Sequence, residues 1–253
     1  MFKRCIIITG ASSGIGRAAA LRFAEAKENI VLVGRNQEAL LAVENEIKAK
    51  DTEALIVNDD VCAEGAAQKI IAAVVEKFSR CDVLVTAAGI IGNGTIENTA
   101  LADWDRMMDI NVRSIFQLMQ AATPHLIQTQ GNIVNVSSVT GTRSFPNVLA
   151  YCVSKAALDQ LTRCAALDLA PKGVRVNAVN PGVVVTNLHR RSGFDEPKYA
   201  AFLEHSKTTH PLGRVGTPEE IAELIFFLAS EKAGWITGET ISIDGGRQLT
   251  CAR

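Results

Sequence analysis

The sequence has no hydrophobic run longer than six residues, whereas a membrane-spanning helix needs about 20. It also has no excess of basic charge: 26 Lys and Arg residues stand against 27 Asp and Glu residues, so the net charge is −1. Binding to nucleic acid or to anionic lipid depends on such an excess. We therefore expect no membrane partner and no nucleic-acid partner.

Cysteine pairs at metal or redox spacing are missing too. The cysteines are Cys5, Cys62, Cys81, Cys152, Cys164 and Cys251, and no two form a C-x-x-C motif. A chain of this length needs no disulfides, so free thiols in a reducing compartment are expected. No two of the four histidines have metal-ligand spacing, which predicts no metal site. A strand pattern begins by Arg4 and leaves no room for a targeting peptide, so the expected location is the cytoplasm.

Linkers rich in Gly, Ser or Pro are absent, and so are repeats, which favours a single domain over 1–253. Short β-branched runs alternate with amphipathic segments along the chain. The expected strands are 5–9, 30–34, 54–57, 83–86, 132–137, 174–180 and 240–243, and the expected helices are 16–28, 37–50, 63–78, 101–127, 151–170 and 218–230. This alternation predicts an α/β fold, a doubly wound sheet of about seven parallel strands with helices on both faces.

One segment, about 186–217, interrupts the alternation. Long insertions in a compact α/β domain are usually lids or binding loops, so a substrate lid is expected here, with a short helix around 197–206. His189, Arg190 and Arg191 lie in it. These basic residues either meet a phosphate of a carrier-bound substrate or form a solvated loop.

A glycine-rich loop follows the first expected strand: Thr9-Gly10-Ala11-Ser12-Ser13-Gly14-Ile15-Gly16, with a helix expected to open at Arg17. Gly10 would turn the chain out of the strand, Gly14 would let the backbone approach a diphosphate, and Gly16 would let the helix pack on the strand. The helix N-terminus would then offer N–H groups to the phosphates. The loop therefore predicts dinucleotide binding.

The Gly-x-x-x-Gly-x-Gly spacing resembles that of the short-chain dehydrogenase/reductase family, and the resemblance covers essentially the whole chain. Within the family the chain is most similar to the 3-oxoacyl-(acyl-carrier-protein) reductase type. The runs that carry this are Gly213-Arg214-Val215-Gly216-Thr217-Pro218-Glu219-Glu220, Ile236-Thr237-Gly238-Glu239 and Asp244-Gly245-Gly246. The resemblance implies a Rossmann-type domain that transfers hydride between a nicotinamide cofactor and a carbonyl or alcohol.

Tyr151 and Lys155 are spaced i, i+4 on an expected helix, so their side chains share one face. A ketone reduction needs a proton donor beside the carbonyl oxygen. An ammonium about 5 Å from the phenol would contribute on the order of 3 kcal/mol, so Lys155 is expected to lower the pKa of Tyr151 by about two pKa units. Ser138 ends the fifth strand, where its hydroxyl would reach a substrate.

The family resemblance completes a catalytic set of Asn111, Ser138, Tyr151 and Lys155. It implies that Tyr151 is the acid/base and that Ser138 polarises the carbonyl. It also implies that Lys155 lowers the tyrosine pKa and binds the nicotinamide ribose, while Asn111 holds a water that relays protons to Lys155.

The resemblance implies a cofactor cradle as well. Asp60 and Val61 would contact adenine, and Val183 and Thr186 would hold the carboxamide. The expected cofactor-binding residues are Gly10, Ser12, Ser13, Gly14, Ile15, Gly16, Arg35, Asn36, Asp60, Val61, Ala88, Gly89, Tyr151, Lys155, Pro181, Gly182, Val183 and Thr186.

One segment departs from the family pattern. Thr86-Ala87-Ala88-Gly89 stands where Asn-Asn-Ala-Gly is usual. The Thr86 hydroxyl can still bridge to a neighbouring strand. We expect lower stability or affinity here, without loss of function.

The end of the second strand predicts which cofactor is used. An NAD enzyme places an acid there for the ribose 2′-OH, but this chain has Gly34 followed by Arg35. A guanidinium fits a 2′-phosphate, so NADP(H) is expected even though Ser13 stands where a second basic residue is often found.

The substrate side is expected to be apolar, from Ile90, Ile91, Phe145, Val148, Val184, Leu188 and the lid. A hydrophobic ketone is therefore favoured over a charged sugar, and 3-oxoacyl thioesters, steroid-like ketones and small xenobiotic carbonyls stay open. Two alternatives are an NAD-linked alcohol or hydroxysteroid dehydrogenase and a catalytically silent nucleotide-binding sensor or scaffold.

The expected helices over 101–127 and 151–170 carry more apolar residues than one sheet-facing stripe needs. Those residues are Met107, Ile110, Ile115, Phe116, Leu118, Met119, Leu158, Leu161, Cys164, Leu167 and Leu169. The surplus indicates a second packing partner, and the resemblance implies a homotetramer.

Overall fold

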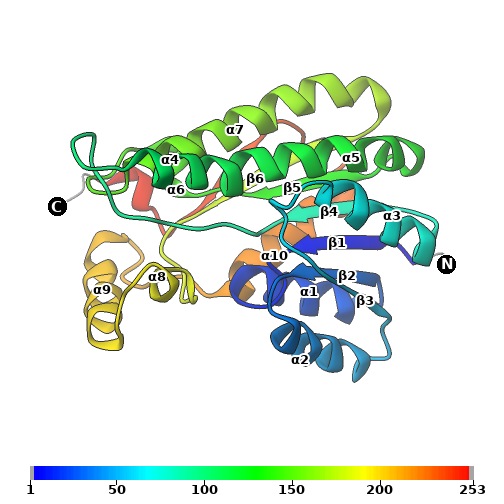
Figure 1. Ribbon diagram of the computed structural model, residues 1–253, viewed down its shortest axis with the longest axis horizontal. Coiled ribbons are helices and arrows are strands. Elements are labelled where there is room, and N and C mark those ends of the chain that lie inside the picture. Colours follow the sequence, from blue (N-terminus) through cyan, green and yellow to red (C-terminus); the bar gives the residue numbers. More distant parts are fainter. Residues whose placement is uncertain (1–2, 251–253) are drawn as a thin grey trace.

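Seven parallel strands form one sheet in the order β3-β2-β1-β4-β5-β6-β7 in the computed structural model, which describes residues 3–250 (Figure 1). The strands are β1 Cys5–Thr9, β2 Asn29–Gly34, β3 Ala54–Asn58, β4 Val83–Thr86, β5 Asn132–Val136, β6 Arg175–Pro181 and β7 Thr240–Ile243. Each lies within one or two residues of its expected place. The predicted doubly wound sheet is therefore confirmed.

Helices cover both faces of the sheet, which explains why strands such as β1 are buried along their whole length. The larger helices are α1 Gly14–Glu25, α2 Gln37–Lys48, α3 Ala66–Phe78, α4 Leu101–Met108, α5 Ser114–Thr129, α7 Leu149–Leu169, α9 Glu196–Thr209 and α10 Pro218–Leu228. The core on one face comes from α1, α2 and α10, and the core on the other from α3, α5 and α7. None of the described helices is long and apolar enough to cross a membrane.

The first helix begins earlier than the sequence suggested: α1 starts at Gly14 rather than at Arg17. The glycines allow this early start. A Cβ on Gly16 would lie 2.4 Å from the Gly10 carbonyl oxygen, so only glycine lets the first turn of α1 pack so closely on the end of β1. The loop is correspondingly short, and the helix N-terminus lies directly beside it.

The predicted helix over 101–127 is continuous in space but not in hydrogen bonding. α4 and α5 are joined by a π-helical turn, Asp109–Arg113, with Asn111 at its centre. Such turns occur mostly as single insertions at functional positions. Periodicity did not reveal this turn, because one extra residue barely disturbs a pattern of about 3.6 residues.

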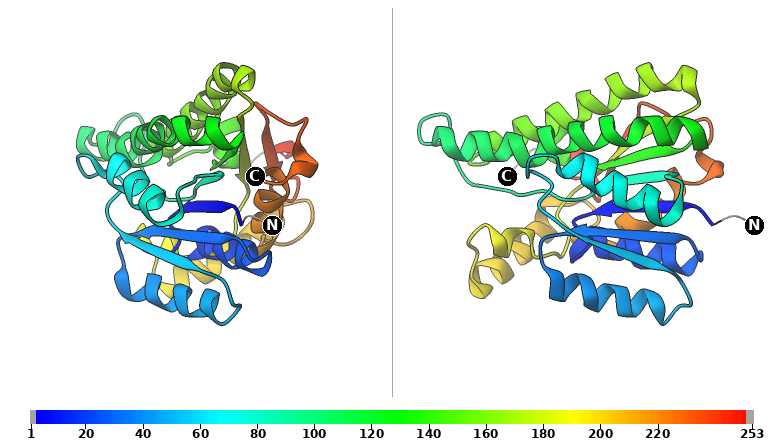
Figure 2. Two further views of the ribbon diagram at one scale, coloured as in Figure 1. Left: turned by 90° about the vertical axis from the view of Figure 1, so that its right-hand side faces the viewer. Right: turned by 45° about the vertical axis from the view of Figure 1, so that its right-hand side comes forward.

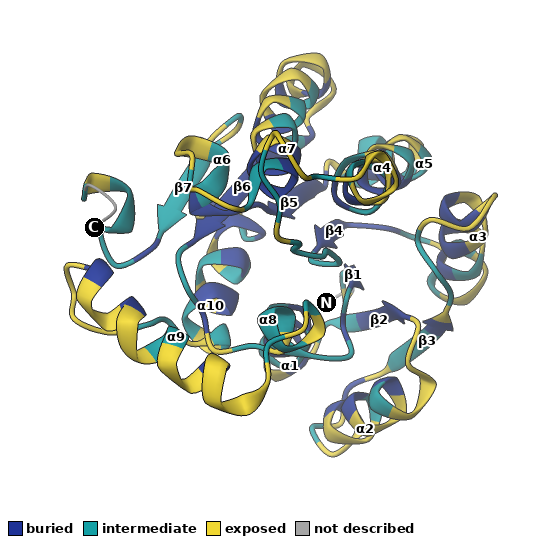
Figure 3. Ribbon diagram, turned by 60° about the vertical axis from the view of Figure 1, so that its left-hand side comes forward, coloured by how far each residue is buried: buried dark blue, intermediate teal, exposed yellow. Residues whose placement is uncertain are grey.

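Strand order reverses between β1 and β4, and the carboxyl ends of the strands form the crevice where ligands bind in such sheets. The predicted lid lies at this end of the sheet, as α8 Leu188–Arg191 and α9 (Figure 2). The expected helix over 197–206 is thus longer than predicted. Most of α9 is exposed along its outer side (Figure 3).

Candidate active site

A cleft of about 260 Å³ opens at the carboxyl ends of the strands. The glycine loop, the ends of β2 to β6 and the start of the lid line it. With one exception, every predicted cofactor-binding residue is among its lining residues. The exception is Asn36, whose side chain accepts the Ala39 N–H at 3.0 Å and caps α2, so its contact with the cofactor stays a prediction.

The glycine loop fits a dinucleotide diphosphate. Gly10 has φ +66°, and a Cβ there would lie 2.8 Å from the Ala87 carbonyl oxygen. The loop and the segment after β4 can therefore meet only if residue 10 is glycine. Ser13 precedes α1 without capping it by its side chain, which leaves the first turn open towards the cleft. An uncapped helix N-terminus beside a glycine loop is a suitable site for phosphate.

The predicted catalytic side chains come together in this cleft. Tyr151 and Lys155 lie in the first two turns of α7, and Ser138 follows β5. The Ser138 hydroxyl accepts the Thr140 N–H at 3.2 Å and lies within hydrogen-bonding reach of the Tyr151 hydroxyl. The two hydroxyls therefore lie close together in the cleft, although they come from different elements.

The charge environment of Tyr151 differs from the sequence-based expectation. Burial raises the pKa of Tyr151 to about 12, and the hydrogen bond from Ser138 opposes this only in part. The expectation that Lys155 lowers this pKa is not met here, because desolvation of the phenolate dominates. Tyr151 therefore holds its proton firmly at neutral pH.

Lys155 is nearly inaccessible to solvent. Its Nζ donates to the Val136 carbonyl oxygen at 2.8 Å and lies 5.8 Å from the centre of the Tyr151 ring. Burial lowers the pKa of Lys155 to about 8, against a smaller opposing effect of Asp159. Desolvation therefore raises the pKa of Tyr151 and lowers the pKa of Lys155.

Asn111 lies behind the cleft and is completely buried. Its side chain accepts the Ile90 N–H and donates to the Ile90 carbonyl oxygen, both at 2.9 Å, and it also lies 3.1 Å from Ser154 Oγ. It thus fixes the segment after β4 against α7. A Cβ on Gly89 would lie 3.2 Å from Asn111 Oδ1 and 3.7 Å from Lys155 Nζ, so Gly89 separates the two groups.

A second buried amide was missed by sequence reasoning. Asn180 donates to the Ser138 carbonyl oxygen at 3.0 Å and to Asp159 Oδ2 at 2.8 Å. It therefore links the end of β6 to α7 and holds the backbone of Ser138. Nothing in the sequence spacing indicates that Asn180 and Asp159 are partners.

The carboxamide segment also needs a correction. The Val183 N–H donates to His210 Nε2 at 3.1 Å, and the Val183 carbonyl accepts the Gly216 N–H at 2.9 Å. Val183 is therefore occupied within the protein. The parallel bridge between Val184 and Gly216 turns the backbone groups of Val184 the other way, and no hydrogen bond to them is found among residues 3–250.

Known proteins resemble this chain along nearly its whole length. A family model described as enoyl-(acyl carrier protein) reductase matches residues 10–248. The 3-oxoacyl-(acyl-carrier-protein) reductases FabG of Staphylococcus aureus and Thermotoga maritima are 38% and 37% identical to it, and each comparison covers 96% of this chain and 97% of the relative. This chain belongs to the short-chain dehydrogenase/reductase family. The resemblance drawn from the motifs is confirmed.

Solved structures of similar fold support the same family assignment. A short-chain dehydrogenase/reductase of unknown function from Caenorhabditis elegans, solved with cofactor, gives a TM-score of 0.93 at 34% identity and covers 99% of this chain and 97% of that chain. Aldohexose dehydrogenase of Thermoplasma acidophilum, in ligand-free form, gives 0.87 at 31% identity, with coverage of 99% and 96%. The chain is therefore an oxidoreductase of a family that uses a nicotinamide cofactor and acts on CH–OH or C=O groups.

At the adenosine end, the departure from the family pattern at Thr86 is accommodated. The Thr86 hydroxyl donates to Asn135 Oδ1 at 2.7 Å, so it bridges to the neighbouring strand as expected. Arg35 lies at the end of β2, and its Nη1 is 3.3 Å from Asp60 Oδ2. Both side chains are exposed, so this pair is weak and available to a ligand.

At the substrate end, Ile90, Ile91, Val184 and Leu188 line the cleft as predicted. Phe145 and Val148 do not. Val148 packs in a small cluster around Met107 and Tyr151, and the Phe145 ring lies 5.0 Å from the Arg247 guanidinium carbon.

Proposed function

We propose that this chain reduces a hydrophobic ketone, of the 3-oxoacyl type or similar, to a secondary alcohol with NADPH. The observation that carries the proposal is the convergence of the Ser138 and Tyr151 hydroxyls in the cleft that the glycine loop also lines. Two hydroxyl donors at one place suit a carbonyl oxygen on which negative charge develops. They suit it better than the carbon–carbon double bond that the family model's description names.

The residues then divide the work. The nicotinamide cofactor, when bound, supplies the hydride. Ser138 orients the carbonyl by donating to its oxygen, and Tyr151 transfers its proton to the same oxygen as the C–H bond forms. Protonated Lys155, whose Nζ lies 5.8 Å from the centre of the Tyr151 ring, favours the tyrosinate left behind, by less than burial disfavours it.

The remaining cofactor and positioning roles follow from the contacts already described. Asn111 holds the segment after β4 in place through Ile90. The water relay from Asn111 stays a prediction. The carboxamide contact is assigned to the backbone of Val184, whose groups are turned away from the bridge to Gly216, together with the Thr186 hydroxyl.

Arg35 at the end of β2, where an NAD enzyme places an acid, favours NADPH-linked reduction over the alternative, an NAD-linked alcohol or hydroxysteroid dehydrogenase. A silent sensor or scaffold is disfavoured because Asn111, Ser138, Tyr151 and Lys155 are all present and the last three line one cleft.

NADPH is proposed over NADH because Arg35, and no acid, follows β2. Its only carboxylate neighbour within 4 Å among residues 3–250 is the exposed Asp60. The apolar lining supports a hydrophobic substrate, as the name 3-oxoacyl-(acyl-carrier-protein) reductase implies for the relatives, over the aldohexose of the structural neighbour.

The proposed setting is a reducing cytoplasm. Cys5, Cys62, Cys81, Cys152 and Cys164 are free thiols, which supports it. Cys251 lies outside the described residues.

A ketone panel tests the function. The purified chain is mixed with 3-oxoacyl thioesters, cyclic hydrophobic ketones and aldohexoses, and absorbance of the reduced cofactor is followed with NADPH and NADH in parallel. We expect turnover of an apolar ketone with NADPH. Tight NADPH binding without turnover of any ketone would favour the sensor instead, and a preference for NADH would favour the NAD-linked alternative.

A further inference from the structure

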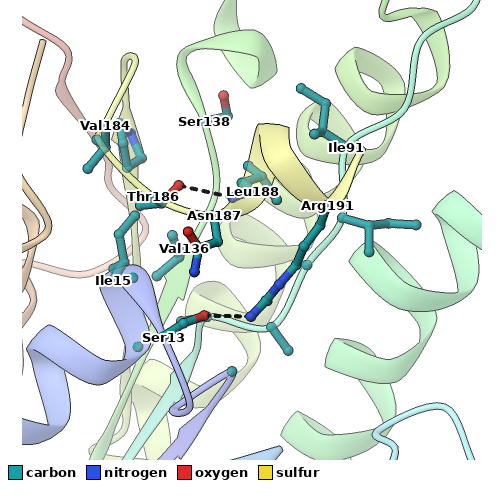
Figure 4. A pocket seen from close by; sticks show the side chains of 18 of the residues that line it. Ser13, Ile15, Ile91, Val136, Ser138, Val184, Thr186, Asn187, Leu188 and Arg191 are labelled. Atoms are coloured by element: carbon teal, nitrogen blue, oxygen red, sulfur yellow. Dashed lines mark hydrogen bonds between the residues drawn. The ribbon is translucent and has the colours of Figure 1, made fainter. Parts of the chain in front are cut away.

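The side chain of Arg191 crosses from the lid to the glycine loop. Arg191 is the last residue of α8, and its Nη2 lies 3.0 Å from Ser13 Oγ (Figure 4). Both residues line the cleft. Ser13 directly precedes α1 and carries no charge, so the lid brings a guanidinium to a place where the loop has none.

Its two lid neighbours are used otherwise. Arg190 pairs with Glu196 at 2.6 Å and lies over the Tyr199 ring at 4.0 Å. The His189 ring packs against Phe202 at 4.4 Å. In the sequence these three basic residues form one group, but in the structure only Arg191 directs its charge into the cleft.

Arg191 has no acidic partner. Among residues 3–250 no carboxylate lies within 4 Å of its guanidinium, and its one side-chain hydrogen bond is to the neutral hydroxyl of Ser13. Arginine at an exposed site usually finds a carboxylate or turns to water. Here the guanidinium is held across the cleft instead.

The place that Arg191 reaches is itself electropositive. Ser13 is the N-cap residue of α1, but its side chain does not cap the helix, so the N–H groups of the first turn face the same space as the guanidinium. The positive end of the helix dipole adds to this charge. A Cβ on Gly14 would lie 3.2 Å from Thr186 Cγ2, so the start of the lid already covers this turn. The Arg191 guanidinium and the N-terminus of α1 therefore place positive charge in the same space, which favours an anion there.

We propose that Arg191 binds the diphosphate of the dinucleotide cofactor and so ties the lid to cofactor occupancy. This inference rests on the proposed function, since it needs a dinucleotide in the cleft. The diphosphate is chosen over the 2′-phosphate because Ser13 lies at the N-terminus of α1, where a diphosphate binds. A 2′-phosphate would lie at the end of β2, beside Gly34 and Arg35.

The inference is tested by measuring the dissociation constants of NADPH and NADH by calorimetry, without substrate, for wild type and Arg191→Gln. The diphosphate is common to both cofactors, so we expect roughly tenfold weaker binding of each, by similar factors. Affinity should also fall less steeply with salt in the variant. Arg191→Lys should recover part of the affinity because it keeps the charge but not the fork.

Arg17→Gln is the matched control. Arg17 is also in the first turn of α1, but it pairs with Glu46 at 2.6 Å and does not line the cleft, so its loss should leave both dissociation constants unchanged. Thermal unfolding of all variants shows that they fold.

The outcomes separate this inference from the function on which it rests. Unchanged affinities in Arg191→Gln, with a wild type that binds either cofactor, overturn the inference alone. A loss confined to NADPH overturns the diphosphate assignment in favour of the 2′-phosphate. A wild type that binds neither cofactor refutes the proposed function, and the inference with it.

Discussion

Tyr151 and Lys155 lie one helical turn apart, and burial moves their pKa values in opposite directions, to about 12 and about 8. The sequence indicates the pair but not its environment. An ammonium brings the pKa of a neighbouring phenol below its ordinary value only if its attraction for the phenolate exceeds the cost of burying the phenolate. In this cleft the cost of burial is larger. The residue-scale predictions follow from this balance and from the charge at the end of β2.

Replacing Tyr151 with Phe should abolish turnover and leave cofactor binding intact. The change removes the proton donor and almost no volume, and loss of general acid help is typically worth about 10²- to 10⁴-fold in rate. Single-ketone kinetics and NADPH titration measure the two effects. A variant that keeps most of its kcat would show that Tyr151 is not the acid.

Cofactor preference should invert in the double variant Gly34→Asp, Arg35→Ala. A Cβ at Gly34 would lie 3.5 Å from Leu40 Cδ2 and 3.7 Å from Ser12 Oγ, which is ordinary van der Waals contact, so the backbone accepts a side chain there. One charge-assisted hydrogen bond is worth about 1.5–3 kcal/mol, or roughly 10- to 150-fold in affinity, and the new acid repels a 2′-phosphate. The measurement is kcat/KM with both cofactors and one ketone. A wild type that already prefers NADH contradicts the argument.

Hydrogen bonds hold the lid to the rest of the fold at both ends of α9. α9 is anchored at its start by Tyr199, whose hydroxyl accepts the Thr186 N–H at 3.1 Å and donates to the Thr186 carbonyl at 2.9 Å. At its end the anchor is His210, between Ser206 and Val183. Both anchors attach the lid to the segment proposed to hold the nicotinamide.

Removing the first anchor should loosen the lid. Tyr199→Phe leaves two backbone groups of Thr186 without a partner, which costs about 1–3 kcal/mol of unfolding free energy. We expect lower stability in urea and a KM that rises more than kcat falls. The chain has only two tyrosines, so Tyr151→Phe, expected to stay stable and lose kcat, is the matched control. Equal stability of wild type and Tyr199→Phe would contradict the anchor.

The second anchor makes stability depend on pH. Nδ1 of His210 lies 2.6 Å from the Ser206 carbonyl, so it carries the proton, and Nε2 must stay unprotonated to accept the Val183 N–H. Burial lowers the pKa of His210, a direction that Arg247 supports and the Ser206 carbonyl and Asp244 oppose.

The unfolded chain therefore takes up this proton at higher pH than the folded protein, starting from the ordinary value of 6.5. The contribution of His210 to the free energy of unfolding should be level above about pH 7 and should fall as the pH drops below 6.5. Urea unfolding at several pH values measures it. His210→Gln should weaken the dependence, whereas His205→Gln, at an exposed position on α9, should not. An unchanged dependence in His210→Gln would contradict this role.

For the whole molecule, the apolar surplus that predicted a second partner is mostly used within one chain. Met107, Ile115, Leu118, Met119, Leu158 and Leu169 are buried in the described chain. Phe116 on α5 and Val153 and Leu167 on α7 stay exposed, by 47%, 40% and 78%. Two neighbouring helices that both expose apolar side chains favour a face between copies, so the homotetramer stays a proposal with a smaller surface behind it.

Light scattering at micromolar concentration should give four times the chain mass. Leu167→Arg should reduce that mass because a charge would be buried between copies. Leu41→Arg, on α2 at the other face of the sheet, should not, although Leu41 is similarly apolar and 43% exposed. A monomeric wild type would remove the proposal.

The sequence by itself determined the succession of strands and helices along the chain, the glycine loop, and the placement of Tyr151 and Lys155 on one helix face. These are local: a buried parallel strand is apolar throughout, and residues four apart on a helix share a face. Family spacing extended this to Ser138 and Asn111. Such features depend on residues near each other in the chain, so one sequence is enough to find them.

Tertiary structure alone decided what each polar group meets. Three hydrogen bonds join segments that are distant in sequence. They link Arg191 to Ser13, Asn180 to Asp159, and the Val183 N–H to His210. Partners, burial and therefore pKa values are set by where the chain returns in space, and no local pattern encodes that return.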